Sequence, residues 1–123
     1  MKGSLIQNSV IHQGKGHGVS IKNSYSIQLV NNAIVDFVQH GLKVTNSHDI
    51  LIDENWLFYV RPEADEEPKM FYYPEDPEGF GAFTLSEGNH GMTVTNNIAA
   101  GSWHHGFHFV PNKCEENNPD FIF

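Results

Sequence analysis

The stretch HGVSIKN at 17–23 returns as HGLKVTN at 40–46 and as HGFHFVPN at 105–112. Each copy joins His-Gly to alternating apolar residues and ends in Asn. The third copy follows the second after a longer interval than the second follows the first. The longer interval equals two of the shorter ones plus an insertion that is nearly as long as one shorter interval. A phrase that returns with a period near two dozen residues indicates the stacked turns of a solenoid.

A second phrase, an asparagine between short apolar runs, keeps the same period. Asn and Gly tolerate left-handed backbone, which the corners of a solenoid require. We expect structural repeat positions at Asn8, Asn32, Asn55, Asn97, Gly18, Gly41 and Gly106.

The composition favours strands and turns over helices. Ile and Val number 18 against 6 Leu, and Asn reaches 12, whereas a leucine-rich repeat needs abundant Leu. Apolar residues alternate with period 2, as in 42–44, and none recur at helical spacing over three turns. The sequence therefore predicts an all-β fold, a right-handed parallel β-helix of about four coils at 4–24, 25–47, 48–86 and 87–113.

The alternation also predicts which side chains face the interior. The residues expected to point inward are Ile21, Leu29, Ile34, Val44, Ile52 and Phe109. Those expected to face water are Lys22, Lys43 and Asp53.

The third coil is interrupted by an acidic, proline-rich segment. Residues 61–78 contain four Pro and seven acidic residues, which predicts a loop insertion at 61–79 that leaves the coil. FGAFTLS at 80–86 then takes the place of HGLKVTN, with its register open by one residue. We expect 1–123 to form a single β-helix segment of a longer solenoid, because 121–123 has the pattern of a further strand.

Charge excludes some partners. The formal net charge of −8 argues against nucleic acid, whose phosphates need a basic surface, and against contact of this segment with an anionic membrane. The single cysteine, Cys114, leaves its pairing state open. No N-x-S/T triplet occurs, so N-glycosylation is not expected.

One stretch is similar to a known family. GAFTLSEGNHGMTVTNNIAAGSWHHGFHFVPNKC at 81–114 resembles the parallel β-helix region of fibrocystin and the fibrocystin-like proteins, and more distantly that of the cell-surface hyaluronidases. The shared features are NNIAAGS at 96–102, GFHF at 106–109 and the Cys that follows. The resemblance implies a large extracellular or cell-surface architecture of which this chain is one segment. No catalytic residue carries over from it.

Histidines and carboxylates are the candidate site residues. His17, His40 and His105 occupy equivalent places in three coils, as the ligands of a zinc site could, but His before Gly at a corner also fills a turn. We expect no bound metal and no other cofactor. Asp36, Asp49, Asp53 and Glu54 lie on adjacent coils, as the carboxyl pair of a glycosidase would. No Lys or Arg cluster accompanies them, so we assign no catalytic residue.

Aromatic residues concentrate in and around the insertion. We expect Trp56 and Phe58 to pack against the coil, and we take Tyr72, Tyr73, Trp103 and His105 as candidate ligand contacts, because exposed rings stack on sugars or partner proteins. The function expected from the sequence is a non-enzymatic extracellular scaffold, or a segment that binds glycans or proteins. Its partners would be flanking coils or neighbouring copies stacked end to end, as in a filament. The alternative is a fragment of a polysaccharide-acting enzyme.

Overall fold

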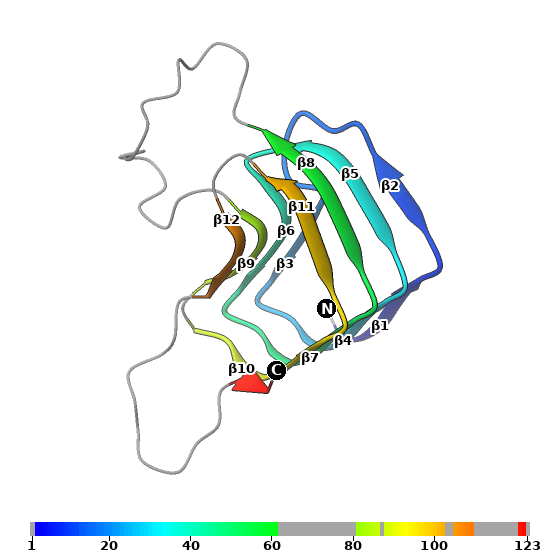
Figure 1. Cartoon of the computed structure of the whole chain (residues 1–123). Helices are drawn as coiled ribbons and strands as arrows, with labels where there is room; N and C mark the ends of the chain where they lie inside the picture. Colours follow the sequence, from blue (N-terminus) through cyan, green and yellow to red (C-terminus); the bar gives the residue numbers. More distant parts are fainter. Residues whose placement is uncertain (1, 62–80, 87, 103–104, 110–120, 123) are drawn as a thin grey trace.

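The computed structural model describes residues 2–61, 81–86, 88–102, 105–109 and 121–122. The regular elements in these ranges are all strands, arranged as three parallel sheets around a common interior (Figure 1). Sheet A contains β1 (Lys2–Gln7), β4 (Tyr25–Val30), β7 (His48–Asp53), β10 (His90–Thr95) and β13 (Phe121–Ile122). Sheet B contains β2 (Val10–His12), β5 (Ala33–Val38), β8 (Trp56–Arg61) and β11 (Ile98–Ser102). Sheet C contains β3 (Val19–Lys22), β6 (His40–Thr45), β9 (Gly81–Leu85) and β12 (His105–Phe109).

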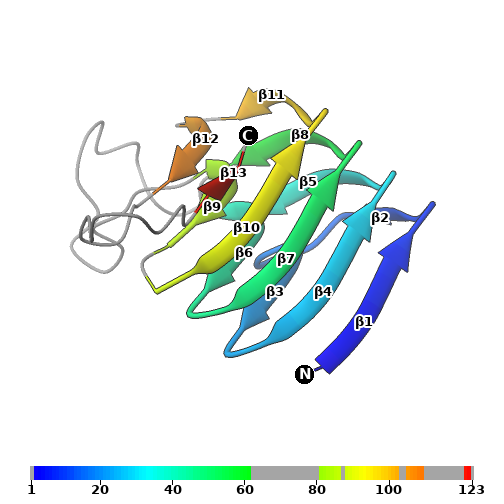
Figure 2. The ribbon, with the colours of Figure 1, turned by 90° about the horizontal axis from the view of Figure 1, so that it is seen from below.

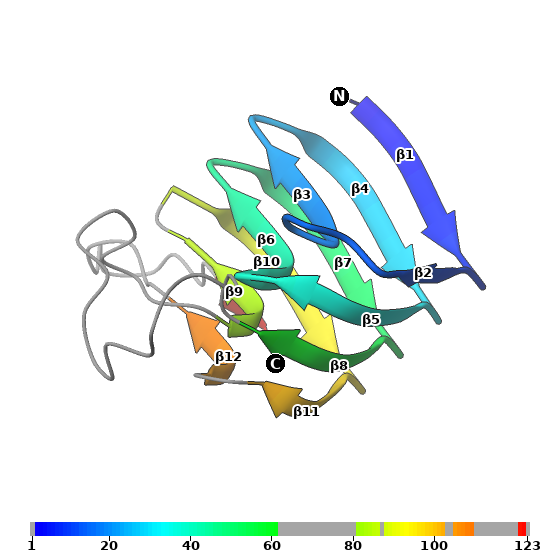
Figure 3. The ribbon, with the colours of Figure 1, turned by 90° about the horizontal axis from the view of Figure 1, so that it is seen from above.

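Three successive strands, one from each sheet, make up what we term a layer: β1–β3, β4–β6, β7–β9 and β10–β12. Each strand pairs with its counterpart in the next layer, as the ordered strands of sheet A show in Figure 2 and those of sheets B and C in Figure 3. Ile27 lies opposite Ile50, and Val19 lies opposite Leu42, so both pairs keep the interval that separates the first two His-Gly phrases. This register confirms the period predicted from the sequence. The all-β stack is consistent with a parallel β-helix.

The register also locates the extra residues of the β7–β9 layer. Val38 still pairs with Arg61 at the ordinary repeat interval, whereas His40 pairs with Gly81, so the extra residues enter between β8 and β9. His48 pairs with His90, which shows that one more residue is added before β10. Arg61 is the last residue of β8, and the rest of the predicted insertion lies outside the described residues. Gly81, and not Phe80, lies opposite His40, so the register that the sequence left open is resolved.

The predicted core is largely confirmed. The buried members of the inward set are Ile21, Leu29, Ile34, Val44 and Ile52. Phe109 is only partly buried, because it lies in the β10–β12 layer, where no described strand stacks on β12. Lys22 is exposed as predicted, whereas Lys43 and Asp53 are half-buried.

Left-handed backbone recurs in columns that follow the layers. The corner between sheets A and B has positive φ at Asn8, Asn31, Glu54 and Asn96. The corner between a strand of sheet C and the sheet A strand of the following layer has positive φ at Asn23, Asn46 and Gly88. Two further columns of positive φ lie within the sheets. The column in sheet A consists of Gly3, Ser26, Asp49 and Gly91. The column in or beside the strands of sheet B consists of Gln13, Asp36, Tyr59 and Gly101. A left-handed residue bends a strand locally as a bulge does, so these columns curve sheets A and B at the same place in every layer.

The repeated His-Gly has a steric cause. A Cβ on Gly18 would lie 2.5 Å from the Gly41 carbonyl oxygen, and one on Gly41 would lie 2.8 Å from the Ala82 carbonyl oxygen. The chain enters sheet C at this point so close to the next layer that a side chain does not fit in the first two layers. His90-Gly91 serves another purpose, because His90 begins β10 in sheet A and Gly91 has a φ of 58°.

Candidate functional site

The candidate ligand contacts fall mostly outside the described part of the chain. Tyr72, Tyr73 and Trp103 all lie outside the described residues. His105 is half-buried at the start of β12, and its ring centroid lies 4.7 Å from that of His108. His105 pairs with Gly81 in the neighbouring strand.

The three equivalent histidines do not form a continuous column. The rings of His17 and His40 contact each other at 4.8 Å, and His40 is fully buried with Nδ1 2.8 Å from Thr84 Oγ1. Gly81 occupies the corresponding place in the β7–β9 layer, between His40 and His105. Among the described residues, no three His, Cys, Asp or Glu side chains are grouped as metal ligands. Its complete burial and its contact with Thr84 give His40 a packing role at the start of β6.

Three of the four candidate carboxylates, all except that of Glu54, have separate contacts within the described residues. Asp36 Oδ1 accepts a hydrogen bond from Arg61 Nε at 2.7 Å, and Asp49 Oδ2 lies 2.9 Å from Nδ1 of His48. Asp53 Oδ1 accepts hydrogen bonds from the Thr95 hydroxyl at 2.7 Å and from Asn96 Nδ2 at 3.0 Å. These two bonds, Thr95 first, hold the pKa of Asp53 below its usual value, because they stabilise the ionised carboxylate. Asp53 therefore favours the ionised form, and not the protonated form that the general acid of glycoside hydrolysis needs.

An asparagine ladder joins the layers at the corner between sheets A and B. Asn55 Oδ1 accepts from the main-chain N–H of Asn32, and Asn97 Oδ1 accepts from the main-chain N–H of Asn55. In return each carboxamide donates to a carbonyl in the preceding layer, Asn55 to Leu29 O and Asn97 to Ile52 O. Asn32, Asn55 and Asn97 thus share one role: their side chains form hydrogen bonds with main-chain N–H and C=O groups at the corner, where pairing between strands does not supply partners.

Asn8 does not belong to this ladder. Ser9 takes the equivalent position, and its main-chain N–H donates to Asn32 Oδ1. Asn8 lies one residue earlier, on the exposed left-handed column, where its Oδ1 accepts from Asn31 Nδ2. A second ladder, at the corner before sheet A, runs from the Ser24 N–H to Ser47 Oγ and from the Ser47 N–H to Asn89 Oδ1.

The outward side of sheet B carries an uncharged, mostly apolar surface. One column across the sheet consists of Val10, Ala33, Trp56 and Ile98. The next consists of His12, Val35, Phe58 and Ala100. We term these eight residues the sheet B face. The inward column between them, Ile11, Ile34, Leu57 and Ala99, belongs to the core or packs against it, so sheet B is apolar on both sides.

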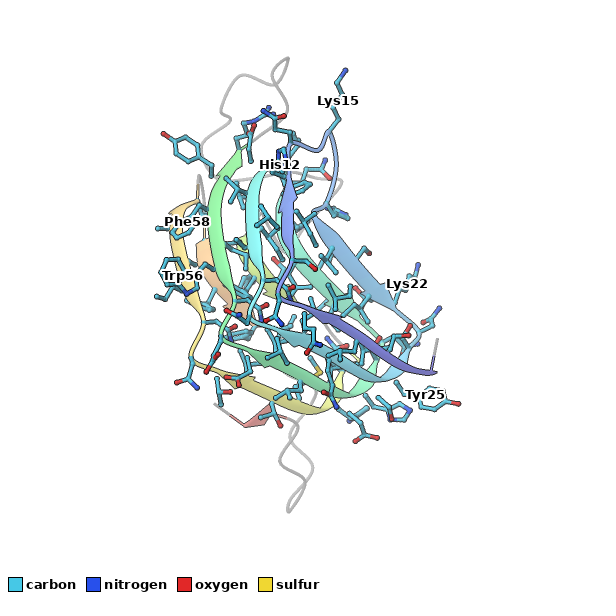
Figure 4. All side chains as sticks on the ribbon, turned by 90° about the vertical axis from the view of Figure 1, so that its right-hand side faces the viewer. His12, Lys15, Lys22, Tyr25, Trp56 and Phe58 are labelled. Carbon is cyan, nitrogen blue, oxygen red and sulfur yellow. The ribbon has the colours of Figure 1, made fainter. Side chains whose placement is uncertain are left out.

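Trp56 is the largest exposed group on the sheet B face. Its side chain is 52% exposed and contacts Phe58 edge to face, with ring centroids 5.9 Å apart. Figure 4 shows both rings directed away from the interior, on the opposite side of the molecule from Lys22 and Tyr25. Tyr59, 68% exposed, follows on the same strand, and the exposed Asp36–Arg61 ion pair lies at the far end of β5 and β8. Large exposed apolar patches on soluble domains mark binding sites.

The sequence interpretation missed this surface. It predicts that Trp56 packs, and Trp56 does contact Phe58, but the side chain remains half-exposed. The signal is present in the period, because Val10, Ala33 and Trp56 follow one another at the repeat interval. Residues with that spacing share a column and therefore a side of the sheet.

Comparison of the chain with protein-family models, with curated proteins and with solved structures finds no match. The described residues contain no helix long and apolar enough to cross a membrane.

Proposed function

We propose that this chain is a non-enzymatic segment of an extracellular or cell-surface scaffold that binds glycan through the sheet B face. The single observation that supports the proposal is an exposed tryptophan within an uncharged apolar surface, flanked by Tyr59. The C–H faces of sugar rings stack on exposed aromatic rings, while their hydroxyls need polar partners. The Asp36–Arg61 pair at the border offers such partners.

The architecture that we propose for this scaffold is a right-handed parallel β-helix of about four coils. It is the solenoid that the resemblance to the fibrocystin β-helix region implies, and the three parallel sheets are in keeping with it. A rigid solenoid suits an extended ligand, because successive layers present equivalent positions about 4.8 Å apart.

The test is an NMR titration of the ¹⁵N-labelled chain with neutral and acidic oligosaccharides, followed at the Trp56 indole N–H. We expect shifts confined to sheet B, with a loss of affinity of about tenfold or more in Trp56→Ala. The matched control is Tyr25→Ala, which removes an exposed ring stacked on His48 in sheet A and leaves binding unchanged. Absence of any shift at Trp56 with every saccharide class would contradict the proposal.

A turnover assay distinguishes glycan binding from the alternative function, which is cleavage of a polysaccharide. We expect no shortening of hyaluronan or related polymers, because Asp36, Asp49 and Asp53 each have a separate partner. Cleavage that is lost in Asp36→Asn or Asp53→Asn would favour the enzyme instead.

A further inference from the structure

We propose that the glycan bound by the sheet B face is a neutral, linear chain of about three sugar units that lies along β8. We further assign to the Asp36–Arg61 ion pair the discrimination against acidic glycans. Both assignments rest on the proposed function, because they name the class of glycan, its direction and its length for the same surface.

The exposed aromatic rings of this surface follow one strand. Trp56, Phe58 and Tyr59 all belong to β8, and Figure 4 shows the first two one above the other beside that strand. The residues that pair with Trp56 and Phe58 in the flanking strands are aliphatic, namely Ala33, Ile98, Val35 and Ala100. A ligand that stacks on more than one ring must therefore lie along β8 and not along the direction in which the layers stack.

Each of the three rings has a small residue on one side in a flanking layer. These residues are Ala33 beside Trp56, Ala100 beside Phe58 and Gly101 beside Tyr59. A Cβ on Gly101 would lie 3.9 Å from Cδ2 of Tyr59, so a longer side chain there would cover that ring. The small neighbours leave the rings open on that side, which is the access that a flat sugar ring needs in order to stack.

Trp56 and Arg61 mark the two ends of the site. They are the first and last residues of β8. A strand of six residues spans about 16 Å, which is the length of about three linked sugar rings. The apolar faces of the sugars would stack at the Trp56 end, and their hydroxyls would reach the ion pair at the other end.

The ion pair determines which charge the site accepts. Asp36 and Arg61 are the only Asp, Glu, Lys or Arg residues in the four strands of sheet B. Asp36 Oδ1 lies 2.7 Å from Arg61 Nε, so the two charges compensate each other. A sugar hydroxyl both donates and accepts, and it can bond to the carboxylate and the guanidinium together. A sugar carboxylate only accepts, so it would compete with Asp36 for Arg61 beside a like charge.

Matched trisaccharides test the charge preference. The neutral probes are β-linked trimers of glucose, mannose and N-acetylglucosamine, and the acidic probes are the equally linked trimers of glucuronic and mannuronic acid. Affinity is measured from the NMR shift of the Trp56 indole N–H. We expect the best neutral trimer to bind at least about threefold more tightly than the best acidic trimer. Equal or tighter binding of the acidic trimers overturns this inference and leaves glycan binding intact, whereas no shift with any trimer contradicts the proposed function itself.

Asp36→Asn tests the role of the ion pair. The variant should bind the acidic trimers about three- to fivefold more tightly than the wild type does, because the charge of Arg61 becomes available to the sugar carboxylate. The matched control is Asp49→Asn in β7 of sheet A, which removes the same charge from a residue that also lies beside a basic side chain. Both aspartates have left-handed backbone, with φ of 63° and 54°, which Asn tolerates. An equal gain in the two variants, or no gain in Asp36→Asn, overturns the assignment to the ion pair.

Tyr59→Asn tests the direction of the ligand. It removes the ring and keeps a residue that tolerates the φ of 59° at this position. We expect it to weaken binding of the best neutral trimer by about fivefold. Amide shifts in the wild type should follow β8 from Trp56 to Arg61. Shifts that instead follow the column from Val10 to Ile98, together with unchanged affinity in Tyr59→Asn, would overturn the orientation along β8.

Discussion

The asparagine ladder predicts that Asn55→Ala is far more damaging than its small change in volume suggests. Asn55 is fully buried, and its Oδ1 lies 3.1 Å from the main-chain nitrogen of Asn32, while its Nδ2 lies 2.9 Å from the Leu29 carbonyl oxygen. The alanine leaves both groups without this partner in buried surroundings. A buried polar group without a partner costs about 1–3 kcal/mol, so we expect the free energy of unfolding to fall by about 2–5 kcal/mol.

The assay is urea unfolding followed by circular dichroism and tryptophan fluorescence, with coincident transitions as the check on two-state behaviour. Asn55→Ser should fall between wild type and alanine, because the Ser24–Ser47 contact shows that a hydroxyl can accept from a corner N–H. The control is Asn8→Gly, which removes an exposed side-chain bond and keeps the left-handed backbone, and it should cost less than about 0.5 kcal/mol. The reasoning is refuted if Asn55→Ala costs no more than Asn8→Gly.

Three further predictions follow from the corners and the core. Gly41→Ala places a Cβ 2.6 Å from Leu57 Cδ2 and 2.8 Å from Ala82 O, so it should lower the free energy of unfolding by about 1–3 kcal/mol in a thermal unfolding experiment. The control is Gly106→Ala, whose Cβ would lie 3.5 Å from its nearest neighbour and should have almost no effect. Equal effects of the two substitutions would contradict the steric account. Leu29→Ala should cost about 2–4 kcal/mol and Lys22→Ala almost nothing, and a similar loss in both would mean that the register is wrong. The folded-state pKa of Asp53 is lowered, so its contribution to the stability of the fold is complete above the ordinary Asp pKa and is lost as the pH falls through the lowered value. Thr95→Val should raise the pKa of Asp53 measured by NMR titration, because it removes the hydroxyl that donates to the carboxylate. An unchanged titration would exclude the Thr95 hydrogen bond as the cause.

Much of the fold could be predicted from the sequence, because a solenoid repeats its constraints. The interval between the His-Gly phrases predicted the stacking, and the alternation of apolar residues predicted most of the core, including Leu29 and Ile52. The position of the ladder was ambiguous by one residue in the sequence, because either asparagine of the pairs at 31–32 and 96–97 could belong to it. In the first layer this led to Asn8 in place of Ser9.

The bends inside strands could not be predicted. Asp36 and Tyr59 have left-handed backbone because the stacked layers curve together at that column, which ends in Gly101. No local propensity of Tyr favours that conformation. The exposure of Trp56 was missed for a different reason: its hydrophobicity suggests packing, although the repeat interval from Val10 and Ala33 places it in an outward column.

The direction of the asparagine ladder has a consequence for how the chain acquires its structure. Each corner N–H from Ser9 to Asn55 depends on a side chain in the layer that follows it in sequence. During synthesis from the N-terminus, a newly emerged layer therefore keeps an unsatisfied corner until the next asparagine leaves the ribosome. For Asn55 that wait is 42 residues, because the insertion intervenes before Asn97. Translation at about 5–20 residues per second makes this a pause of several seconds, which is the interval in which the growing stack is most exposed to misfolding.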